Sequence, residues 1–251
     1  MADWNVAIPS HQRADTIGER TLRMLAEGGV DRERVHVFVG DKEADEYRSG
    51  VDPGLYGHLV THRFGGDVTQ SNNAVNDFFG NGRIVHCDDD LDGISQLVDE
   101  KTLAPVVDIP AMFEEGFARA RSHAASLWGI YPVRNPYFMR RRVMTKLCFV
   151  IGHVYGQVLQ GRKGELVTVP VKVDYERSLS HFMMDGCVCR MDWYVADTKV
   201  YAGKGGLVAT RTPALAQDAI NLLAQRYPGL VRQVHHRKRD WPEMRLVPPR
   251  G

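Results

Sequence analysis

The residues with the clearest chemical potential form an acidic run, Asp88-Asp89-Asp90, directly after an apolar segment that ends at Cys87. Three consecutive carboxylates repel one another unless a cation or solvent offsets their charge. At the end of a strand, alternate side chains point to opposite sides, so Asp88 and Asp90 face the same way. Two such carboxylates, completed by water and phosphate oxygens, suit Mg²⁺ or Mn²⁺. This D-x-D motif therefore predicts a metal site at Asp88 and Asp90 that would hold a nucleotide diphosphate.

Two other interpretations of this run stay open. Asp92-Gly93 is a common turn pair, and the carboxylates would then belong to a solvated turn. A calcium-binding EF loop that starts at Asp88 would have Gly93 at its sixth position. Its twelfth position is Asp99 instead of glutamate, however, and no helix precedes it. The apolar strand before the run favours the D-x-D interpretation.

The first half of the chain alternates between β-branched segments and segments with helical spacing, which end at glycine, proline or polar residues. This alternation predicts an α/β fold with a mostly parallel sheet and helices on both faces. Such sheets bind ligands beyond the carboxyl ends of their strands, where the polar segments 9–13, 41–43 and 88–92 would meet. The expected strands are 5–8, 35–39, 55–62 and 83–87, and the expected helices are 15–28 and 70–79.

The second half of the chain has a less regular pattern. Its spacing predicts a long helix over 110–128 and an amphipathic helix over 213–225, which Tyr227-Pro228-Gly229 ends. Strands are expected over 167–173 and 186–194.

Composition adds a few limits. The chain has 251 residues, of which 43% are hydrophobic and 25% charged, as expected for one large α/β domain or two small ones. No apolar run approaches the ~18–20 residues of a membrane helix, and the first residues lack a secretory pattern, so an intracellular, cytoplasmic protein is expected. The four cysteines lack C-x-x-C spacing and are expected to be reduced, buried thiols. They are Cys87, Cys148, Cys187 and Cys189.

Charge by itself does not predict a nucleic-acid partner, because the formal net charge is only +1. Basic residues are nevertheless concentrated at 140–142 and 235–239. Each concentration is either a solvated face or a surface for a polyanion.

The motifs of the first half resemble the donor half of GT-A glycosyltransferases. The residues that carry this resemblance are Ile8-Pro9-Ser10 with Arg13, Thr21-Leu22 with Leu25, Val37-Phe38-Val39 with Glu43 and Tyr47, Gln70-Ser71-Asn72-Asn73, and Asp88-Asp89-Asp90-Leu91. More narrowly, the second half is similar to the TET-associated glycosyltransferases, phage enzymes thought to add sugars to hydroxymethylated cytosine in DNA. The residues of that match are Gly129-Ile130-Tyr131-Pro132-Val133-Arg134-Asn135-Pro136, Val173-Asp174-Tyr175-Glu176-Arg177-Ser178, Asp185-Gly186 with Arg190, Thr198-Lys199, and Gly205-Gly206-Leu207 with Arg211.

The resemblance implies a single Rossmann-like GT-A domain over 1–251, with a nucleotide-sugar-binding half at 1–98 and an α+β acceptor half at 99–251. It implies a Mn²⁺- or Mg²⁺-dependent hexosyltransferase that moves a sugar, from a UDP-sugar above other donors, to 5-hydroxymethylcytosine in DNA. A phage-encoded enzyme would work in the cytoplasm of the host cell, with no membrane partner, and its oligomeric state stays open. The implied donor-binding residues are Pro9, Ser10, Arg13, Asp41, Glu43, Gln70, Asn73, Asp88, Asp89, Lys204, Gly205 and Gly206. The implied acceptor-binding residues are Tyr131, Arg134, Asn135 and Arg177.

Asp174 is the expected catalytic base, because an inverting transfer needs a carboxylate that takes the proton of the acceptor hydroxyl. The alternative is that Asp174 caps a helix that begins near Tyr175, and a retaining reaction would not use such a base. Lys204-Gly205-Gly206 is expected either to contact the diphosphate or to form a plain turn. His235 and His236 are candidates for a third metal ligand or for a phosphate-contacting strip.

Two other functions stay open at this point. The same donor site could serve a glycan, protein or lipid acceptor, or the protein could be a non-catalytic nucleotide- or DNA-binding module. With DNA, the base would be reached in the major groove or after extrusion, and 140–142 and 237–239 would hold the backbone. The aromatic residues that would stack on a base or sugar, or else belong to the core, are Trp128, Tyr131, Tyr137, Trp193 and Trp241.

Overall fold

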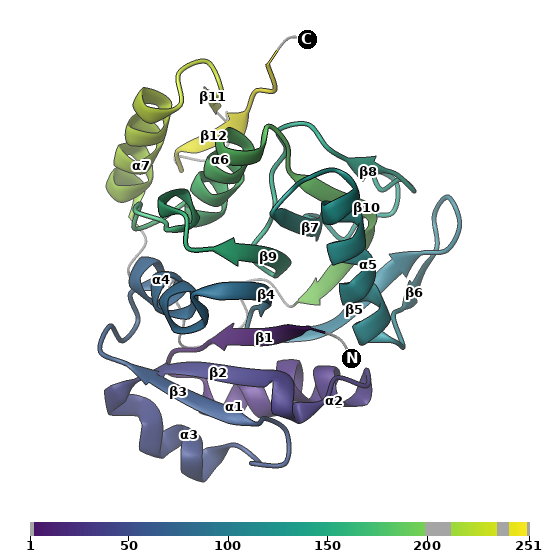
Figure 1. The fold of residues 1–251 in the computed structure, drawn as a ribbon, viewed down its shortest axis with the longest axis vertical. Helices are drawn as coiled ribbons and strands as arrows, with labels where there is room; N and C mark the ends of the chain where they lie inside the picture. Colours follow the sequence, from purple (N-terminus) through teal and green to yellow (C-terminus); the bar gives the residue numbers. More distant parts are fainter. Residues whose placement is uncertain (1–2, 199–211, 235–240, 250–251) are drawn as a thin grey trace.

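A mixed sheet of ten strands runs through the computed structural model, which describes residues 3–198, 212–234 and 241–249. Its strand order is β3-β2-β1-β4-β9-β7-β10-β5-β6, with β8 paired to β10 (Figure 1). A separate hairpin joins β11 (Val231–Val234) to β12 (Glu243–Leu246).

The first four strands of the chain are parallel and form the first half of this sheet. They are β1 (Trp4–Pro9), β2 (Val35–Gly40), β3 (His58–His62) and β4 (Asn81–Cys87). The side chains of β1 alternate between the two faces, as the geometry of a strand requires. Val6 and Ile8 belong to the core cluster that contains Ile17 and Leu25, whereas Ala7 packs in the cluster of Val75.

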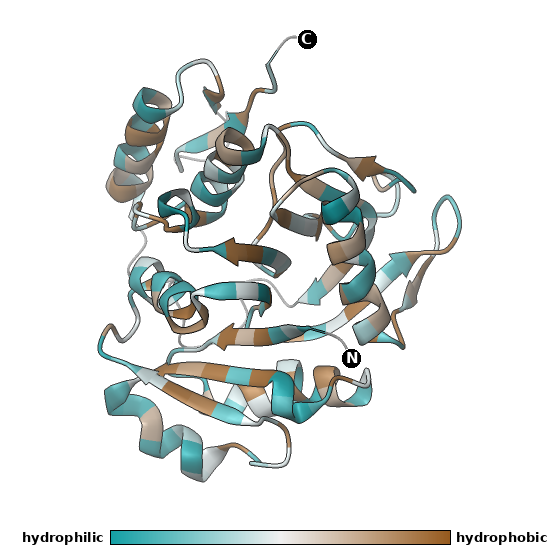
Figure 2. Cartoon of the chain, viewed as in Figure 1, coloured by the Kyte–Doolittle hydropathy of each residue, from teal (hydrophilic) through white to brown (hydrophobic). Residues whose placement is uncertain are grey.

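Helices cover both faces of this parallel half, as the sequence predicts. The first face carries a continuous helical segment, α1 (Ala14–Ile17), the π-helical turn η1 (Gly18–Leu22) and α2 (Arg23–Glu27), together with α3 (Ala44–Gly50). The opposite face carries α4 (Val68–Phe79). The strands between them are mostly hydrophobic, and the outer turns of α3 are hydrophilic (Figure 2).

The second half of the sheet mixes directions. β9 (Val154–Gln160) runs against both β4 and β7 (Leu127–Tyr131), and β10 (Cys189–Thr198) is parallel to β7. β7 and β10 therefore resume the direction of the first four strands, so most of the sheet shares one direction. The remaining strands are β5 (Leu91–Leu97), β6 (Leu103–Pro105) and β8 (Val143–Met144), and the remaining helices are α5 (Ile109–Ser122), α6 (Val173–Asp185) and α7 (Pro213–Arg226).

Two predictions for the second half need correction, one in the length of a helix and one in the presence of a strand. The helix expected over 110–128 ends at Ser122, because Ala124 has a left-handed φ of 54°. Trp128 does not belong to this helix. It lies in β7 and is fully buried, with its ring centroid 5.5 Å from that of Phe117 in α5.

The strand expected over 167–173 is also absent, because side chains bind its backbone in place of a neighbouring strand. The carboxylate of Glu176 accepts from the amides of Thr168 and Val169, at 2.6 and 2.9 Å. Thr69 Oγ1 donates to the carbonyl of Val169 at 2.6 Å. The alternating valines instead form a separate core cluster with α7, and helix α6 begins at Val173.

Other expectations concern the cysteines and the membrane. All four cysteines are free. Cys87 and Cys189 are buried as expected, whereas Cys148 and Cys187 are only partly buried. None of the helices in the described part of the chain combines the length and apolarity needed to cross a bilayer.

Candidate active site

A cavity of about 930 Å³ lies beyond the carboxyl ends of β1 and β4. The strand order reverses between these two strands, and parallel α/β sheets bind ligands at such a point. The N-terminus of α6, the loop before β9 and residues near β12 complete its wall. The predicted site residues that line it are Pro9, Ser10, Arg13, Asp88, Asp89, Asp90, Asp174 and Arg177.

The central carboxylate of the acidic run, Asp89, is buried and bonded within the protein. It accepts from Ser10 Oγ at 2.6 Å and from Arg13 Nη1 at 2.6 Å. Burial raises the pKa of Asp89, and the charge of Arg13 opposes that shift. Asp89 therefore ties the end of β4 to the residues that follow β1.

Asp88 presents its carboxylate to the cavity, with 47% of its side-chain surface accessible. Enclosure by the cavity wall raises the pKa of Asp88 to about 6, with His153 acting against the shift and Asp90, Asp174 and Asp89 adding to it. The site therefore holds several carboxylates close enough to disfavour one another's charge.

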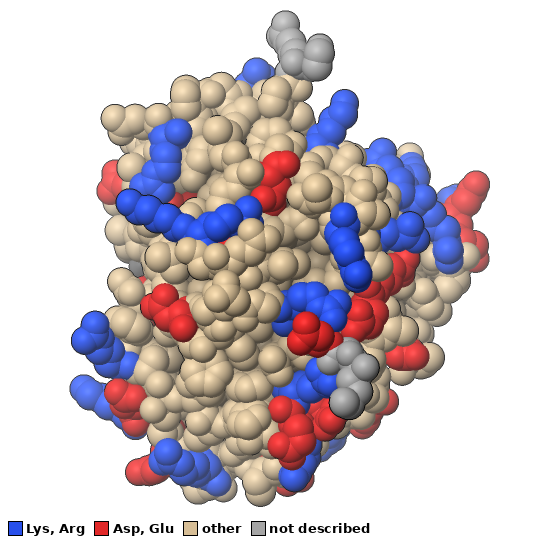
Figure 3. All heavy atoms as spheres, viewed as in Figure 1, with Lys and Arg blue, Asp and Glu red and all other residues tan. Residues whose placement is uncertain are grey.

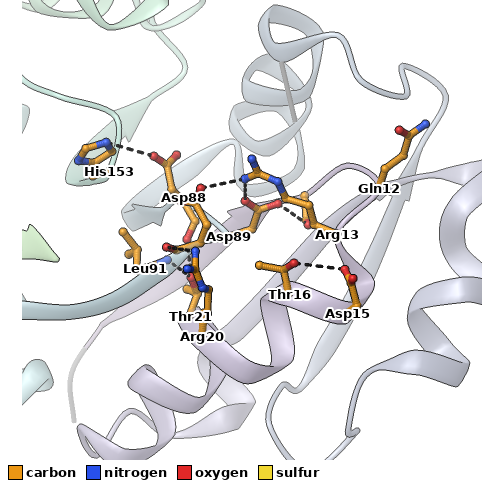
Figure 4. A network of polar contacts seen from close by, with 12 residues as sticks. Gln12, Arg13, Asp15, Thr16, Arg20, Thr21, Asp88, Asp89, Leu91 and His153 are labelled. Atoms are coloured by element: carbon orange, nitrogen blue, oxygen red, sulfur yellow. Dashed lines mark hydrogen bonds and ion pairs between the residues drawn. The ribbon is translucent and has the colours of Figure 1, made fainter. Parts of the chain in front are cut away.

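The backbone of Asp88 is held from both sides, and Figure 4 shows its carboxylate facing the ring of His153. Its amide donates to the carbonyl of His153 at 2.9 Å, and Thr21 Oγ1 donates to its carbonyl at 2.8 Å. Thr21 belongs to the π-helical turn, a feature often found at functional sites. From the same turn, Arg20 Nη1 donates to the carbonyl of Asp90 at 3.2 Å.

His153 is a site residue that sequence reasoning missed. Its Nε2 lies 4.0 Å from Asp88 Oδ2, because β9 pairs with β4 so that Val154 faces Cys87. The only signal in the sequence is a histidine within the apolar stretch 146–159. That stretch does not reveal which strand lies opposite.

Asp174 lies in the first turn of α6 and lines the same cavity. It is not the N-cap, because that position belongs to Lys172, which has a left-handed φ of 66°. The positive end of the helix dipole favours a carboxylate here. Its side chain packs against Gly152, where an added Cβ would come within 2.9 Å of Oδ1.

Buried Arg177 fixes the position of the Asp174 carboxylate from the protein interior. Only 3% of Arg177 is exposed, and its Nη1 donates to Asp174 Oδ1 at 3.1 Å. Its Nη2 donates to Asn72 Oδ1 at 3.1 Å, and its guanidinium lies 3.9 Å from the ring centroid of Tyr155. Tyr155 in turn stacks on His86, with ring centroids 4.5 Å apart. The position of Arg177 suits a support for Asp174 better than the acceptor contact implied by the resemblance.

On α4, the cavity is lined by Val68, Ser71 and Asn72, and the donor residues expected there, Gln70 and Asn73, lie outside its lining. Gln70 is exposed. The amide of Asn73 is bonded on both sides by the backbone of Val167, at 2.8 and 2.9 Å. Consecutive residues of a helix point in different directions, so Ser71 and Asn72 face the cavity while Gln70 and Asn73 do not.

Asp41 and Glu43 follow β2 and lie outside the cavity lining. Glu43 forms an ion pair with His11, which does line the cavity, and its Oε2 accepts from the amide of Gln12 at 3.0 Å. Burial lowers the pKa of His62 at the end of β3, and the charges of Asp41 and Glu43 oppose that shift.

Of the expected acceptor residues, Tyr131 ends β7, and Arg134 and Asn135 lie on the connection to β8; all three are outside the cavity lining. Arg190 lies over the ring of Tyr131, at 5.3 Å from its centroid. Arg134 pairs with Asp197, and Asn135 Oδ1 accepts from the amide of Tyr137 at 3.1 Å.

Several expected contacts fall outside the described residues. They concern Lys204, Gly205, Gly206, His235, His236 and the basic residues 237–239.

The residues present fit a hard divalent cation. Asp88 and Asp90 supply carboxylate oxygens, and a cation would relieve the repulsion between the neighbouring carboxylates, which adds to the effect of burial on the pKa of Asp88. Within 3–198, 212–234 and 241–249, no group of three or more histidine, cysteine or acidic side chains could hold a metal ion. A Mg²⁺ or Mn²⁺ ion held by two carboxylates would take its other ligands from substrate phosphates and water.

No protein-family model matches the sequence, and a search of the curated proteins finds no match. Solved structures that share the fold include the following two. Staphylococcus aureus TarS superposes with a TM-score of 0.54 at 11% identity over 90% of this chain and 39% of that one. The mannosyltransferase PcManGT from Pyrobaculum calidifontis, solved with GDP-Man and Mn²⁺, gives 0.54 at 16% identity over 90% of this chain and 64% of that one. The chain therefore spans less than two thirds of either protein, and what it shares with them is the GT-A type of α/β fold.

Proposed function

We propose that this protein is a metal-dependent glycosyltransferase that moves a hexose from a nucleotide sugar to 5-hydroxymethylcytosine in DNA. The observation that carries this proposal is the meeting of Asp88, Asp90 and Asp174 around one cavity at the reversal of the sheet. In this proposal the chain is one GT-A domain, in which 1–98 bind most of the donor and 99–251 bind the acceptor.

The donor would lie against the ends of β1 and β4. Asp88 and Asp90 would hold Mn²⁺ or Mg²⁺, which when bound offsets the negative charge of a leaving diphosphate. Arg13 and Arg20 also line the cavity and would face the phosphates. The structural neighbour solved with GDP-Man and Mn²⁺ supports a nucleotide sugar and a divalent cation as partners, and a UDP-sugar is the donor we expect first.

Asp174 would serve as the general base in a single displacement. The acceptor hydroxyl would give its proton to a carboxylate oxygen of Asp174 while its oxygen bonds to the anomeric carbon, and the bond from that carbon to the diphosphate oxygen would break. Arg177 supports this role because it fixes the carboxylate from inside the protein, at 3.1 Å. A base that is already held in position lowers the entropic cost of reaching the reactive geometry.

Aromatic side chains near Asp174 support a flat acceptor. Phe149 and Tyr175 line the cavity, and their ring centroids are 4.4 Å apart. Trp241 lines the same wall. Aromatic rings stack on the face of a base or a sugar. Of the other aromatic candidates, Trp128 is fully buried and Trp193 is 8% exposed, so these two belong to the core.

The connection between β7 and β8 supports a polyanionic acceptor. Tyr137 and Phe138 are 65% and 57% exposed, and Arg140-Arg141-Arg142 follow them on the surface. Basic side chains gather on the edge of the molecule where Figure 1 draws β8 (Figure 3). Arginines and exposed aromatic rings together suit phosphates and unstacked bases.

This surface is linked to the cavity wall by a chain of polar contacts. Arg142 and Arg190 both donate to the buried carboxylate of Asp192, at 3.0 and 2.7 Å. Arg190 also donates to the carbonyl of Phe149, at 2.9 Å. DNA held at 140–142 would thus lie next to the acceptor side of the cavity.

The test is incubation with hydroxymethylcytosine DNA, Mn²⁺ and a panel of nucleotide sugars, followed by mass spectrometry of the nucleosides. We expect a mass increase of one hexose, absent with unmodified cytosine DNA and with Asp88→Asn protein. No increase with any donor would overturn the DNA acceptor. A glycan acceptor, the second candidate, would instead show sugar transfer in a parallel screen of oligosaccharides.

A further inference from the structure

The guanidinium of Arg13 lies between two carboxylates of the acidic run. Its Nη1 is 2.6 Å from Asp89 Oδ1 and 3.1 Å from Asp90 Oδ2, and 16% of its side chain is exposed. Its backbone is also fixed, because the amide of Arg13 donates to the hydroxyl of Tyr47 at 3.1 Å. Tyr47 is fully buried and bonded to Ser10 at 2.7 Å. The position of this cation is therefore set by the core.

This arrangement disfavours the binding of a metal ion in the absence of a diphosphate. Asp90 is one of the two proposed metal ligands, and Arg13 already offsets its charge. A divalent cation at Asp90 would add a second positive charge within a few ångströms of the guanidinium, where like charges repel strongly in a partly buried site. A second arginine adds to the effect, since Arg20 contacts the carbonyl of Asp90 and pairs with Asp92 at 3.2 Å.

A diphosphate would remove this conflict in two ways. Its oxygens would complete the shell of a metal held by the two carboxylates Asp88 and Asp90. Its negative charge also gives Arg13 a partner, because guanidinium groups bind phosphate through two parallel hydrogen bonds. Arg13 lines the cavity and is placed to make that exchange.

We propose that Arg13 couples metal binding to donor binding: it neutralises Asp90 in the empty site and transfers to the diphosphate when metal and donor bind together. This inference rests on the proposed function. It assigns Arg13 a positioning role beyond simple donor contact, and it predicts that Mn²⁺ and a nucleoside diphosphate strengthen each other's binding.

The coupling is measured by calorimetry on the whole chain, with Mn²⁺ alone, with UDP or GDP alone, and with each nucleotide at saturating Mn²⁺. We expect each ligand to tighten the other by at least about tenfold, within the usual range of coupling between sites. In Arg13→Gln, Mn²⁺ alone should bind several-fold more tightly, because Asp90 is released. UDP or GDP alone should bind several-fold more weakly, because a cation is lost. A merely structural defect would weaken both.

Two further variants keep the test decisive. Arg13→Gln with Asp89→Asn removes the carboxylate that would otherwise stay buried without its partner, and Mn²⁺ affinity should still rise. Arg23→Gln makes the same charge change on the exposed side of α2 and should leave both affinities unchanged. The inference is overturned if Mn²⁺ affinity stays the same or falls in both Arg13 variants. If wild-type protein binds neither Mn²⁺ nor either nucleotide under any condition, the metal-dependent transferase itself is overturned.

Discussion

Replacing Gly152 by alanine should slow sugar transfer while leaving the donor site intact. Gly152 lies in the loop before β9, and its backbone is not among those with positive φ, so it can accept alanine without strain. The added methyl group would press on the carboxylate of Asp174. This substitution therefore tests the proposed base without changing any charged or polar group.

The size of the effect follows from the distances. An ideal Cβ at position 152 would lie 2.9 Å from Asp174 Oδ1, whereas ordinary contacts begin at 3.4 Å. The carboxylate must retreat by the difference, about 0.5 Å. A misplacement of ~1 Å can cost on the order of 100-fold in rate, so about half that distance should cost roughly 10-fold. Stability should change little, because the displaced atoms lie at the end of a side chain.

Single-turnover transfer measures this effect, with the donor bound and the acceptor in excess. Mn²⁺ and nucleotide affinities should equal those of wild type. The matched control is Gly50→Ala, whose Cβ would lie 3.7 Å from Ala14 Cβ, an ordinary contact far from Asp174 in the chain. A Gly152→Ala protein that transfers sugar at the wild-type rate would refute the assignment of Asp174 as the base.

Three further predictions concern the metal, the core and pH. Asp88→Asn should weaken Mn²⁺ binding at least tenfold and slow transfer on the order of 100-fold, as loss of a group that stabilises developing charge does; unchanged Mn²⁺ binding by calorimetry would contradict the metal site. Gly156→Ala should lower the free energy of unfolding in urea by about 2–3 kcal/mol, because its Cβ would come within 2.7 Å of Cζ2 of buried Trp128. Burial lowers the pKa of His181 from 6.5 to about 3. The folded protein thus binds fewer protons than the unfolded chain in this range, and stability should fall as pH drops below about 6.5, by up to ~1.4 kcal/mol per pH unit. His181→Gln should flatten that slope in denaturation curves at pH 7, 6 and 5, and an unchanged slope would speak against the buried neutral imidazole.

The sequence predicts the parallel half of the fold well, because its signals are local. Each of the strands from β1 to β4 is a short β-branched or apolar run with polar residues at its end, and the helices between them have their own spacing. The position of the acidic run after β4 follows from the same local pattern. Parallel strands then bring their carboxyl ends to one edge, whatever the details of side-chain packing.

The second half shows where local patterns mislead. The valines of 167–173 alternate as in a strand, yet they pack against α7 while Glu176 and Thr69 bind the backbone. Trp128 falls at a helical spacing from the residues of α5, but it is apolar because it packs against Phe117 from strand β7. In both cases burial explains the apolar residue, and burial is shared by helices, strands and irregular segments.

The sequence by itself determined that acidic side chains end a buried strand in an α/β fold, because residue type and local spacing suffice for that. Only the tertiary structure decided which partners those side chains meet. His153 reaches Asp88 through the antiparallel register of β4 and β9, and Arg13 reaches Asp89 and Asp90 across two parallel strands. Asp174 reaches the cavity because α6 packs beside Gly152. Such contacts join residues far apart in the chain, and their geometry depends on strand pairing and core packing that no local pattern contains.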